Sequence, residues 1–507
     1  MMQFQRKFLL RDTLLLGISL AVLTLAAFTS SFGGRWYSIA ANMTVAGLSL
    51  LNLAMLVYEL SDVRRRIPLL IFQGSYNLLL LGRVYTTWLQ NYGRRLDILE
   101  ADGYDSLYWS LQILAISLFV VYLAYRAAGF LFRKRELSVA VEGAKKIWDH
   151  PLIPVIRQLS RWVLYISSLA SFFSLGNTIL FVLRNGYLTS FTETAGVPSI
   201  ISRFALFFTP AFAVFLATLP SAKQMRLPMC VYGVYLLASV FTGRRNTIVT
   251  SLLMLVVYFV LRDNLLPKEK RILTKRVVLL ACVVGLGGVY LLQMVAYLRS
   301  GILGTGDSFF GTIISFIDSQ GASFRVVVKT IDYMEFFDPQ TTYRFLLFPL
   351  ELFVTNNSIG QTVFHTEPII SLQTAEFAES TNSYSHVLTY LVDPARYLRG
   401  EGFGTSYVAE GYVAFGIVGV IALSVMIGVA FRWFSSMLGR SWPVIALGLI
   451  AIKSFVYLPR NYALGWITDV FNVTYLCFLL GLYLAAQLLY TLGTHLRRGT
   501  EPPEVKA

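Results

Sequence analysis

Five arginines in this sequence lie where a membrane protein rarely places a positive charge. They occur in the turn VFTGRRNTIV, in YLRSG at the end of an apolar run, in QGASFRVVV and in the turn LPRNY, and they are Arg244, Arg245, Arg299, Arg325 and Arg460. A guanidinium group stays charged in proteins and binds phosphate oxygens through two parallel hydrogen bonds. Any one of these arginines is equally well explained as an interfacial residue that snorkels to water or pairs with a carboxylate. Together, at several helix ends, they favour a shared anionic ligand near the membrane surface.

A second group of residues that could take part in a reaction lies between residues 381 and 431. Its groups that could act as a base, or orient one, are His386, Asp393 and Glu410. We regard His386 and Glu410 as the candidates, in that order. The alternatives are that His386 is a structural histidine and that Glu410 only interacts favourably with a helix dipole. The same stretch contains small residues that let a backbone or a ligand approach closely, namely Gly402, Gly404, Ser406, Gly411, Gly416 and Gly419.

The composition indicates that the chain carrying these residues is a membrane protein. Of the 507 residues, 56% are hydrophobic and 14% are charged, and the mean hydropathy is +0.61. No soluble globular domain combines these values. The formal charge is +15. In a membrane protein the excess lysines and arginines are expected in cytoplasmic loops that face anionic lipid, so the charge does not indicate nucleic-acid binding. We therefore predict an all-α, polytopic membrane protein.

About twelve segments are long and apolar enough to cross the hydrocarbon core as helices of roughly 20 residues. They lie near residues 12–30, 37–59, 68–90, 107–132, 161–184, 199–219, 226–242, 245–261, 277–298, 413–434, 441–458 and 468–490. Every second connection is basic, and these connections with their flanks hold most of the 43 lysines and arginines. The positive-inside rule then places both termini in the cytoplasm and the turn at residues 242–246 on the outer face.

One outer connection is much longer than the others. Residues 299–412 separate a membrane domain of nine spans, 1–298, from a second membrane segment of three spans, 413–490, and residues 491–507 form a cytoplasmic tail. Long structured loops often carry function. We expect a lid over an outward-facing cavity, and the alternative is padding at the membrane interface.

Two parts of this loop carry helical patterns. Apolar residues recur at helical spacing across residues 308–334. Residues 345–354 are apolar but too few to span a membrane, and Pro349 is expected to break them. Both segments are typical of helices that lie on the membrane surface or dip into it.

The order of these motifs resembles that of the Wzy-type oligosaccharide repeat-unit polymerases of bacterial O-antigen, capsule and common-antigen synthesis. Proteins of that family show a Gly-[Arg/Thr]-Arg turn between two spans, a Leu-Arg end at the next outward span, a large outer loop and an arginine between the last two spans. Similar residues here are Gly243-Arg244-Arg245, Leu298-Arg299 and Arg460. The family pattern G-x-G-x-S-x-x-x-E-x-Y-x-x-F-G-x-x-G is matched at full length by Gly402, Gly404, Ser406, Glu410, Tyr412, Phe415, Gly416 and Gly419.

The resemblance implies a GT-C-like glycosyltransferase at the outer face of the bacterial inner membrane. Such enzymes transfer a growing glycan from undecaprenyl pyrophosphate to a fresh undecaprenyl-pyrophosphate-linked repeat unit. The arginines would bind pyrophosphate and stabilise the leaving charge, and His386 or Glu410 would act on the acceptor hydroxyl. Residues expected to shape the cavity are Gly402, Gly404, Ser406 and Tyr412. The partners implied are the lipid-linked oligosaccharides, membrane lipids and a chain-length regulator of the Wzz type.

The sequence contains no Asp-x-Asp pair, which metal-dependent glycosyltransferases commonly use to hold their cation. We therefore expect catalysis without a metal ion or another cofactor. Two alternatives stay open. One is an O-antigen-ligase-like transferase that passes the chain to another acceptor. The other is a lipid-linked oligosaccharide flippase or transporter, which is less favoured because the basic sites gather at one face and no repeated halves are visible.

Overall fold

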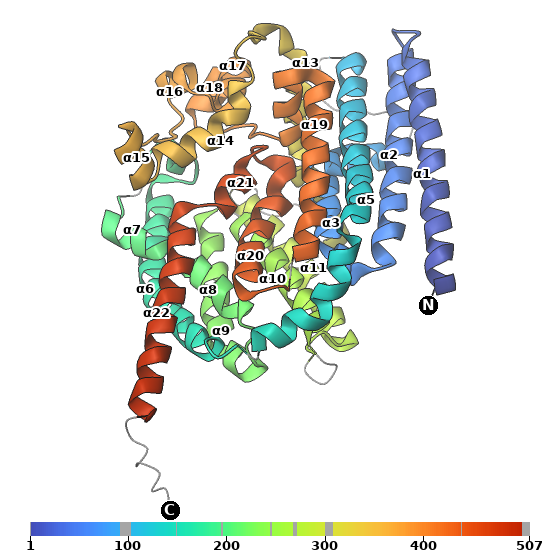
Figure 1. Cartoon of the computed structure of the whole chain (residues 1–507). Coiled ribbons are helices and arrows are strands. Elements are labelled where there is room, and N and C mark those ends of the chain that lie inside the picture. The colour runs from blue at the N-terminus through green and yellow to red at the C-terminus, as the bar shows by residue number, and fades with distance from the viewer. Residues whose placement is uncertain are drawn as a thin grey trace, which may run out of the picture.

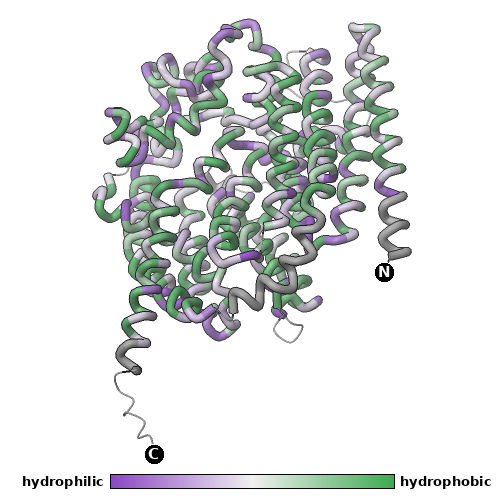
Figure 2. The backbone as a smooth tube through the Cα atoms, in the orientation of Figure 1, coloured by the Kyte–Doolittle hydropathy of each residue, from purple (hydrophilic) through white to green (hydrophobic). Residues whose placement is uncertain are grey.

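The computed structural model is a bundle of long helices that is covered at one end by shorter helices (Figure 1). The structure describes residues 2–91, 103–148, 150–193, 196–243, 246–266, 271–299, 308–437 and 439–498. Within these ranges the chain forms helices and no strand. Twelve segments of the described residues are long and apolar enough to cross a membrane, and the long helices are predominantly hydrophobic along their length (Figure 2). The predicted all-α, polytopic class is confirmed.

All twelve candidate spans overlap the predicted ones. The elements of the first nine are α1 (Met2–Ser30), α2 (Trp36–Leu60), α3 (Val63–Tyr76) with η1 (Asn77–Leu81) and α4 (Gly82–Gln90), α5 (Tyr104–Trp148), α6 (Ile153–Asn185), α7 (Ser199–Ala205) with α8 (Phe208–Ala217), α9 (Ala222–Ser239) with η3 (Val240–Thr242), α10 (Asn246–Leu265) and α11 (Lys275–Arg299). Those of the last three are α19 (Tyr407–Met437), α20 (Trp442–Tyr457) with η7 (Leu458–Arg460), and α21 (Gly465–Val470) with α22 (Val473–Arg498).

Three of the described spans are interrupted within the membrane-crossing length, and the twelfth of them is divided between α21 and α22 at Phe471 and Asn472. The sixth is divided between α7 and α8 at Leu206 and Phe207, and Pro210 follows four residues after Leu206, where its ring would clash with the carbonyl of a continuous helix. The third contains the π-helical turn η1 between α3 and α4. Such turns occur frequently at functional sites, and two residues of η1, Leu78 and Leu79, line the main cavity described below.

The tenth span begins earlier than expected and is kinked. Its helix α19 starts at Tyr407 and has non-helical dihedral angles at Phe415 and Gly416. Gly416 has a φ of +58°, a conformation that glycine adopts without steric cost. At the kink, a side chain on Gly419 would lie 2.1 Å from the backbone oxygen of Gly411. The glycines of this stretch therefore permit the close approach that their spacing suggested.

The long connection folds into short helices at one end of the bundle, which we call the loop end. These elements are α12 (Phe309–Gln320), η5 (Gly321–Ser323), α13 (Phe324–Asp332), η6 (Met334–Phe336), α14 (Arg344–Thr355), α15 (Ser358–Phe364), α16 (Ala375–Ser380), α17 (Tyr384–Val392) and α18 (Pro394–Leu398). The expectation that Pro349 breaks its segment is wrong, because α14 continues through this residue. A proline inside a helix removes one hydrogen bond, and here Pro349 is buried, so packing offsets that loss.

The first part of the connection is fixed to the third span. Asp318 on α12 forms an ion pair of 3.2 Å with Arg83 and accepts a hydrogen bond of 3.0 Å from Thr86 Oγ1. A side chain on Gly321 would lie 2.0 Å from the backbone nitrogen of Arg83, and one on Gly82 would lie 2.8 Å from a backbone oxygen of α12. Backbones meet here without intervening side chains, so this contact sets the position of the loop end on the bundle.

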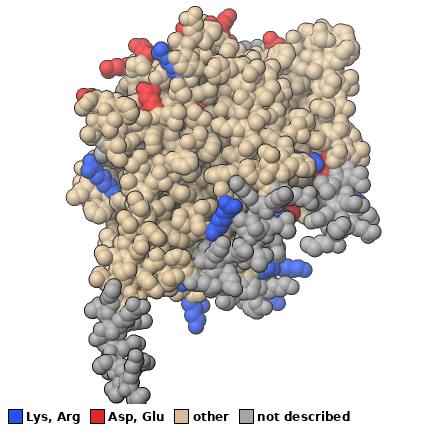
Figure 3. Space-filling model, viewed as in Figure 1, with Lys and Arg blue, Asp and Glu red and all other residues tan. Residues whose placement is uncertain are grey.

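Charged side chains are divided between the two ends of the bundle. On the face drawn in Figure 3, most visible Asp and Glu lie at the loop end, and most visible Lys and Arg lie nearer the opposite end. This distribution agrees with the basic connections noted in the sequence.

Candidate functional site

A large cavity lies between the membrane-crossing helices and the loop end, with a volume of about 1010 Å³. Most of the wall that comes from α3, η1, α10 and α11 is apolar, with Ser75, Asn246 and Thr250 as its polar members; the apolar residues are Ile71, Leu78, Leu79, Val249, Leu253, Val289 and Leu292. The other part is polar and comes from the connection and from η7, through Gln373, Ser385, His386, Arg396, Glu401 and Arg460. A ligand with an apolar tail and a polar or charged head matches this division.

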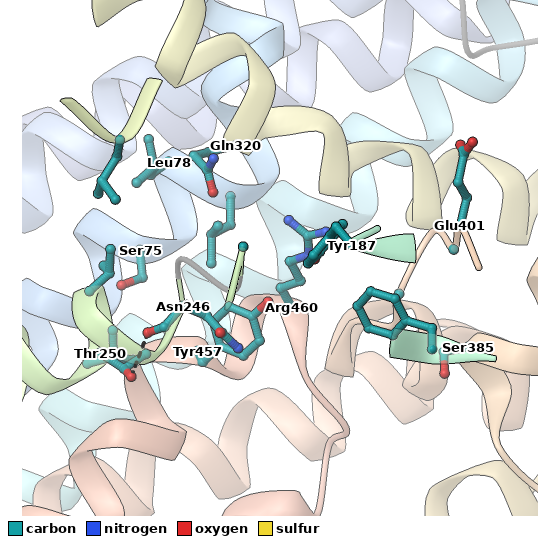
Figure 4. Close-up of a pocket in the computed structure, with 18 of the residues that line it drawn as sticks. Ser75, Leu78, Tyr187, Asn246, Thr250, Gln320, Ser385, Glu401, Tyr457 and Arg460 are labelled. Carbon is teal, nitrogen blue, oxygen red and sulfur yellow. Dashed lines mark hydrogen bonds between the residues drawn. The ribbon is translucent and has the colours of Figure 1, made fainter. Parts of the chain in front are cut away.

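Arg460 is the predicted arginine whose side chain the structure places in the cavity wall. It ends the 3-10 turn η7, which is held by the buried residues Leu458 and Pro459, and its side chain is drawn among the other residues that line the cavity in Figure 4. Arg460 forms no hydrogen bond or ion pair with any residue in the described part of the chain. Its guanidinium group is therefore available to an anionic ligand.

Gly404 allows the chain to pass close to this arginine. It has a φ of +81°, and a side chain placed there would lie 3.8 Å from Arg460 Nε. Gly402 and Gly404 both line the cavity. The structure thus brings two of the predicted small residues together with Arg460 and His386.

A further arginine, Arg396, also lines the polar part, and sequence reasoning missed it. Its Nε lies 2.9 Å from Glu401 Oε2. The guanidinium carbons of Arg396 and Arg325 lie 5.5 Å and 5.6 Å from the centroid of the Phe403 ring, which is within the range of cation–π attraction. Arg325 is therefore next to the polar part of the cavity, although it does not line it. Two arginines thus lie against the Phe403 ring, and one of them, Arg396, is paired with Glu401.

His386 lies in the cavity wall on α17. Its Nδ1 is 2.8 Å from Tyr397 Oη, and its ring forms a T-shaped pair with the Phe377 ring at a centroid distance of 4.9 Å. Burial lowers the pKa of the imidazole to about 4, and burial raises the pKa of Tyr397 to about 12. Both groups are therefore neutral near pH 7. If Nδ1 donates to Tyr397, then Nε2 has a free lone pair and can accept a proton.

Glu410 lies away from the cavity surface. Its side chain is 0% exposed, Oε1 accepts a hydrogen bond of 2.6 Å from Thr405 Oγ1, and Oε2 accepts one of 2.8 Å from the backbone N–H of Ala463. These bonds join the start of α19 to the turn that follows Arg460. A buried carboxylate with both oxygens paired is suited to holding that turn in place.

Three other candidate residues, Ser406, Tyr412 and Asp393, make contacts that stabilise the fold. Ser406 is 0% exposed and immediately precedes α19, where its Oγ accepts a hydrogen bond of 3.3 Å from the N–H of Val408. Tyr412 is partly buried and packs against the main hydrophobic core. Neither lines the cavity. Asp393 Oδ1 accepts a hydrogen bond of 2.9 Å from the backbone N–H of Arg396 and thus caps α18.

The side chains of three predicted arginines lie outside the described part of the structure. Arg244 and Arg245 lie outside the described residues, and Arg299 ends α11 but its side chain is outside the described part. The flanking residues Gly243 and Asn246 line the cavity. In the described ranges, no three His, Cys, Asp or Glu side chains gather as a metal site would require.

Comparisons with curated proteins and with solved structures found no match. A model of the family described as O-antigen polysaccharide polymerase Wzy matches residues 16–492. The match includes the cavity, the loop end and all but the outermost parts of the membrane-crossing bundle. The chain belongs to the O-antigen polysaccharide polymerase Wzy family.

Proposed function

We propose that the protein transfers a growing glycan from a lipid pyrophosphate carrier to a new lipid-linked repeat unit at the outer face of the inner membrane. Membership of the family implies repeat-unit polymerisation. The observation that carries the finer proposal is the cavity of about 1010 Å³, which combines an apolar wall with Arg460 and His386 in its polar part. The lipid-proximal end of such a substrate matches the apolar wall, and its pyrophosphate and sugars match the polar part.

The proposed reaction exchanges one carbon–oxygen bond for another. The bond between the anomeric carbon and the pyrophosphate breaks, and its electron pair leaves with the pyrophosphate. A hydroxyl of the acceptor sugar forms the new bond and loses its proton. The site must therefore stabilise the leaving negative charge and accept or guide one proton.

Arg460 is proposed to stabilise the leaving pyrophosphate. One charge pair at about 4 Å and an effective dielectric constant near 20 gains on the order of 4 kcal/mol before desolvation is subtracted. Arg396 adds positive charge at the same end, although Glu401 offsets part of it. From their sequence positions, Arg244, Arg245 and Arg299 are proposed as further pyrophosphate ligands. These cations supply the electrostatic stabilisation without a metal ion in this proposal.

His386 is proposed as the group that accepts the acceptor proton. It lines the cavity, and its low pKa keeps it in the neutral form that a base requires. Tyr397 fixes the ring through Nδ1 and leaves Nε2 for the acceptor hydroxyl. Glu410 is proposed to position the turn that carries Arg460, because both of its oxygens already have partners.

The proposed orientation places the loop end outside the cytoplasm and both termini inside. It is supported by the basic residues of alternate connections and by the segregation of charge in Figure 3. A pyrophosphate site at the loop end is then accessible to substrates that are presented at the outer face.

The experiment that tests the function uses the purified chain in lipid nanodiscs with one substrate only, a lipid-linked repeat unit. A polymerase is expected to produce a ladder of products that differ by one repeat unit. No product without a second acceptor, followed by transfer when lipid A-core is added, would indicate a ligase and contradict the proposal. Movement of the substrate across a bilayer without new glycosidic bonds would indicate a transporter and also contradict it.

A further inference from the structure

A second, smaller polar cavity, which we call the side chamber, adjoins the main cavity. It has a volume of about 280 Å³ and is lined by residues of α8, α10, α20, the following turn, α21 and α22. Asn246, Thr250 and Tyr457 line both cavities, and Figure 4 shows the three on the wall below Arg460. The main cavity and the side chamber are therefore neighbours that share a wall.

The side chamber contains a lysine in a membrane-crossing helix. Lys453 lies on α20 about two helical turns before Arg460, or roughly 10 Å along the helix axis. It forms no hydrogen bond or ion pair with a residue of the described ranges. Asp469 is the other charged residue of the described wall, and its carboxylate accepts a hydrogen bond from Ser454. A cation at this depth is costly unless an anion compensates it, and Asp469 lines the same chamber without forming an ion pair with Lys453.

The proposed reaction needs two lipid-linked substrates at once. The donor and the acceptor each carry a diphosphate, and two diphosphates cannot occupy one site because like charges repel strongly at short distance. The volume of the side chamber is slightly below the roughly 300–1,000 Å³ of pockets for drug-sized ligands. It can therefore take a diphosphate head but not an oligosaccharide, which must lie in the larger cavity.

We propose that the side chamber binds the diphosphate of the second lipid-linked substrate, with Lys453 as its cationic ligand. This inference rests on the proposed function, because only a reaction between two lipid-linked molecules requires the second site. Asn246, Asn461 and Tyr475 line the chamber and supply amide N–H and phenol O–H donors for phosphate oxygens. Asp469 balances Lys453 while the chamber is empty. The shared wall lets the sugars of the two substrates meet in the main cavity while their diphosphates stay apart.

The test counts bound molecules of a defined probe, undecaprenyl pyrophosphate, by native mass spectrometry of the full chain from phosphatidylcholine nanodiscs. The wild-type protein is expected to bind two probes. Lys453→Met is expected to bind one, with the second site weakened by about tenfold to a hundredfold, as for the loss of a hydrogen bond to a charged group. Lys453→Arg is expected to keep both. Lys275→Met is the matched control, since Lys275 is exposed at the start of α11.

The outcomes separate this inference from the proposed function. One probe on the wild-type protein, or two on a Lys453→Met variant with wild-type thermal unfolding, would overturn the side-chamber site and leave the proposed function standing. Displacement of the second probe by phosphatidylglycerol would show an ordinary headgroup site and would also overturn it. Unchanged probe binding in Arg460→Ala would instead contradict the donor site of the proposed function.

Discussion

Replacing Glu410 by alanine is expected to destabilise the protein, because this side chain holds two parts of the site together. Glu410 is fully buried and accepts hydrogen bonds from Thr405 and from the backbone of Ala463. Alanine leaves both donors buried without a partner, and each such group costs about 1–3 kcal/mol. The two together predict a loss of about 2–6 kcal/mol, before any cost of the cavity left by the missing side chain.

Replacing Glu410 by glutamine tests the same reasoning in the opposite direction. The amide oxygen can accept the bond from the Ala463 N–H, and the amide NH2 can donate to Thr405 Oγ1. The amide therefore keeps both hydrogen bonds, so the expected loss is only about 1–2 kcal/mol. If Glu410 positions the turn, the glutamine variant should retain most of the polymerisation rate. If Glu410 is the general base, the rate should fall by about 10²–10⁴.

The assay pairs thermal unfolding in one detergent with the product ladder from a lipid-linked repeat unit. Glu367→Ala is the control, because Glu367 is exposed in the connection. The expected order of unfolding temperature is wild type and control together, then the glutamine variant, then the alanine variant. A glutamine variant that unfolds like the wild type but makes product at least a hundredfold more slowly would refute the positioning role.

Four further predictions concern the proposed site and its orientation. Arg460→Ala should sharply reduce both donor binding and chain growth, and Arg460→Lys should restore them only in part, since a point charge cannot reproduce the guanidinium fork; full activity of the alanine variant would contradict the phosphate role. The pKa of His386 in the free protein is lowered by burial to about 4, so the neutral base should be lost only as the pH falls through about 4. A plot of kcat/KM against pH should then have no acid limb near the ordinary histidine value of about 6.5, and such a limb that persists in His386→Ala would belong to another group and contradict the role of His386 as the base. Chain growth should persist in excess EDTA, whereas loss that is restored by a divalent cation would show a metal requirement. A reporter inserted near residue 375 should lie outside the cytoplasm and one after residue 140 inside it, and a cytoplasmic site at 375 would contradict the whole mechanism.

The membrane-crossing helices could be predicted from the sequence because their length is set by the thickness of the bilayer. Apolar composition over about 20 residues is a local property, and all twelve predicted spans have counterparts in the structure. Interruptions were harder to predict. The break before Pro210 has a local cause, but no hydrophobic periodicity in the sequence indicates the π-helical turn η1.

The candidate site could be predicted only in part. Arg460 and His386 are exceptional for their surroundings in the sequence, and both line the cavity. Arg396 and Tyr397 stand in an ordinary polar stretch, and only the folding of α17 and α18 brings them to the cavity and to His386. Glu410 was a reasonable candidate because it is an acidic residue near the start of a helix. The sequence alone does not show that its side chain is buried or that it accepts a hydrogen bond from the backbone N–H of Ala463.

The finite cavity has a consequence for how the lengths of the products are distributed. Its wall is fixed on one side where η5 meets the third span with only glycine between the backbones. Under the proposed function, the space of about 1010 Å³ takes only the sugars at the reacting end. Everything beyond those sugars lies outside, and a chain of five units presents the same end as a chain of fifty. The probability that the chain is released instead of extended is then the same after every addition, whatever the length of the chain. Such a process gives a geometric distribution in which short chains are always the most numerous, and any preferred length must be imposed by something that touches the emerging polymer.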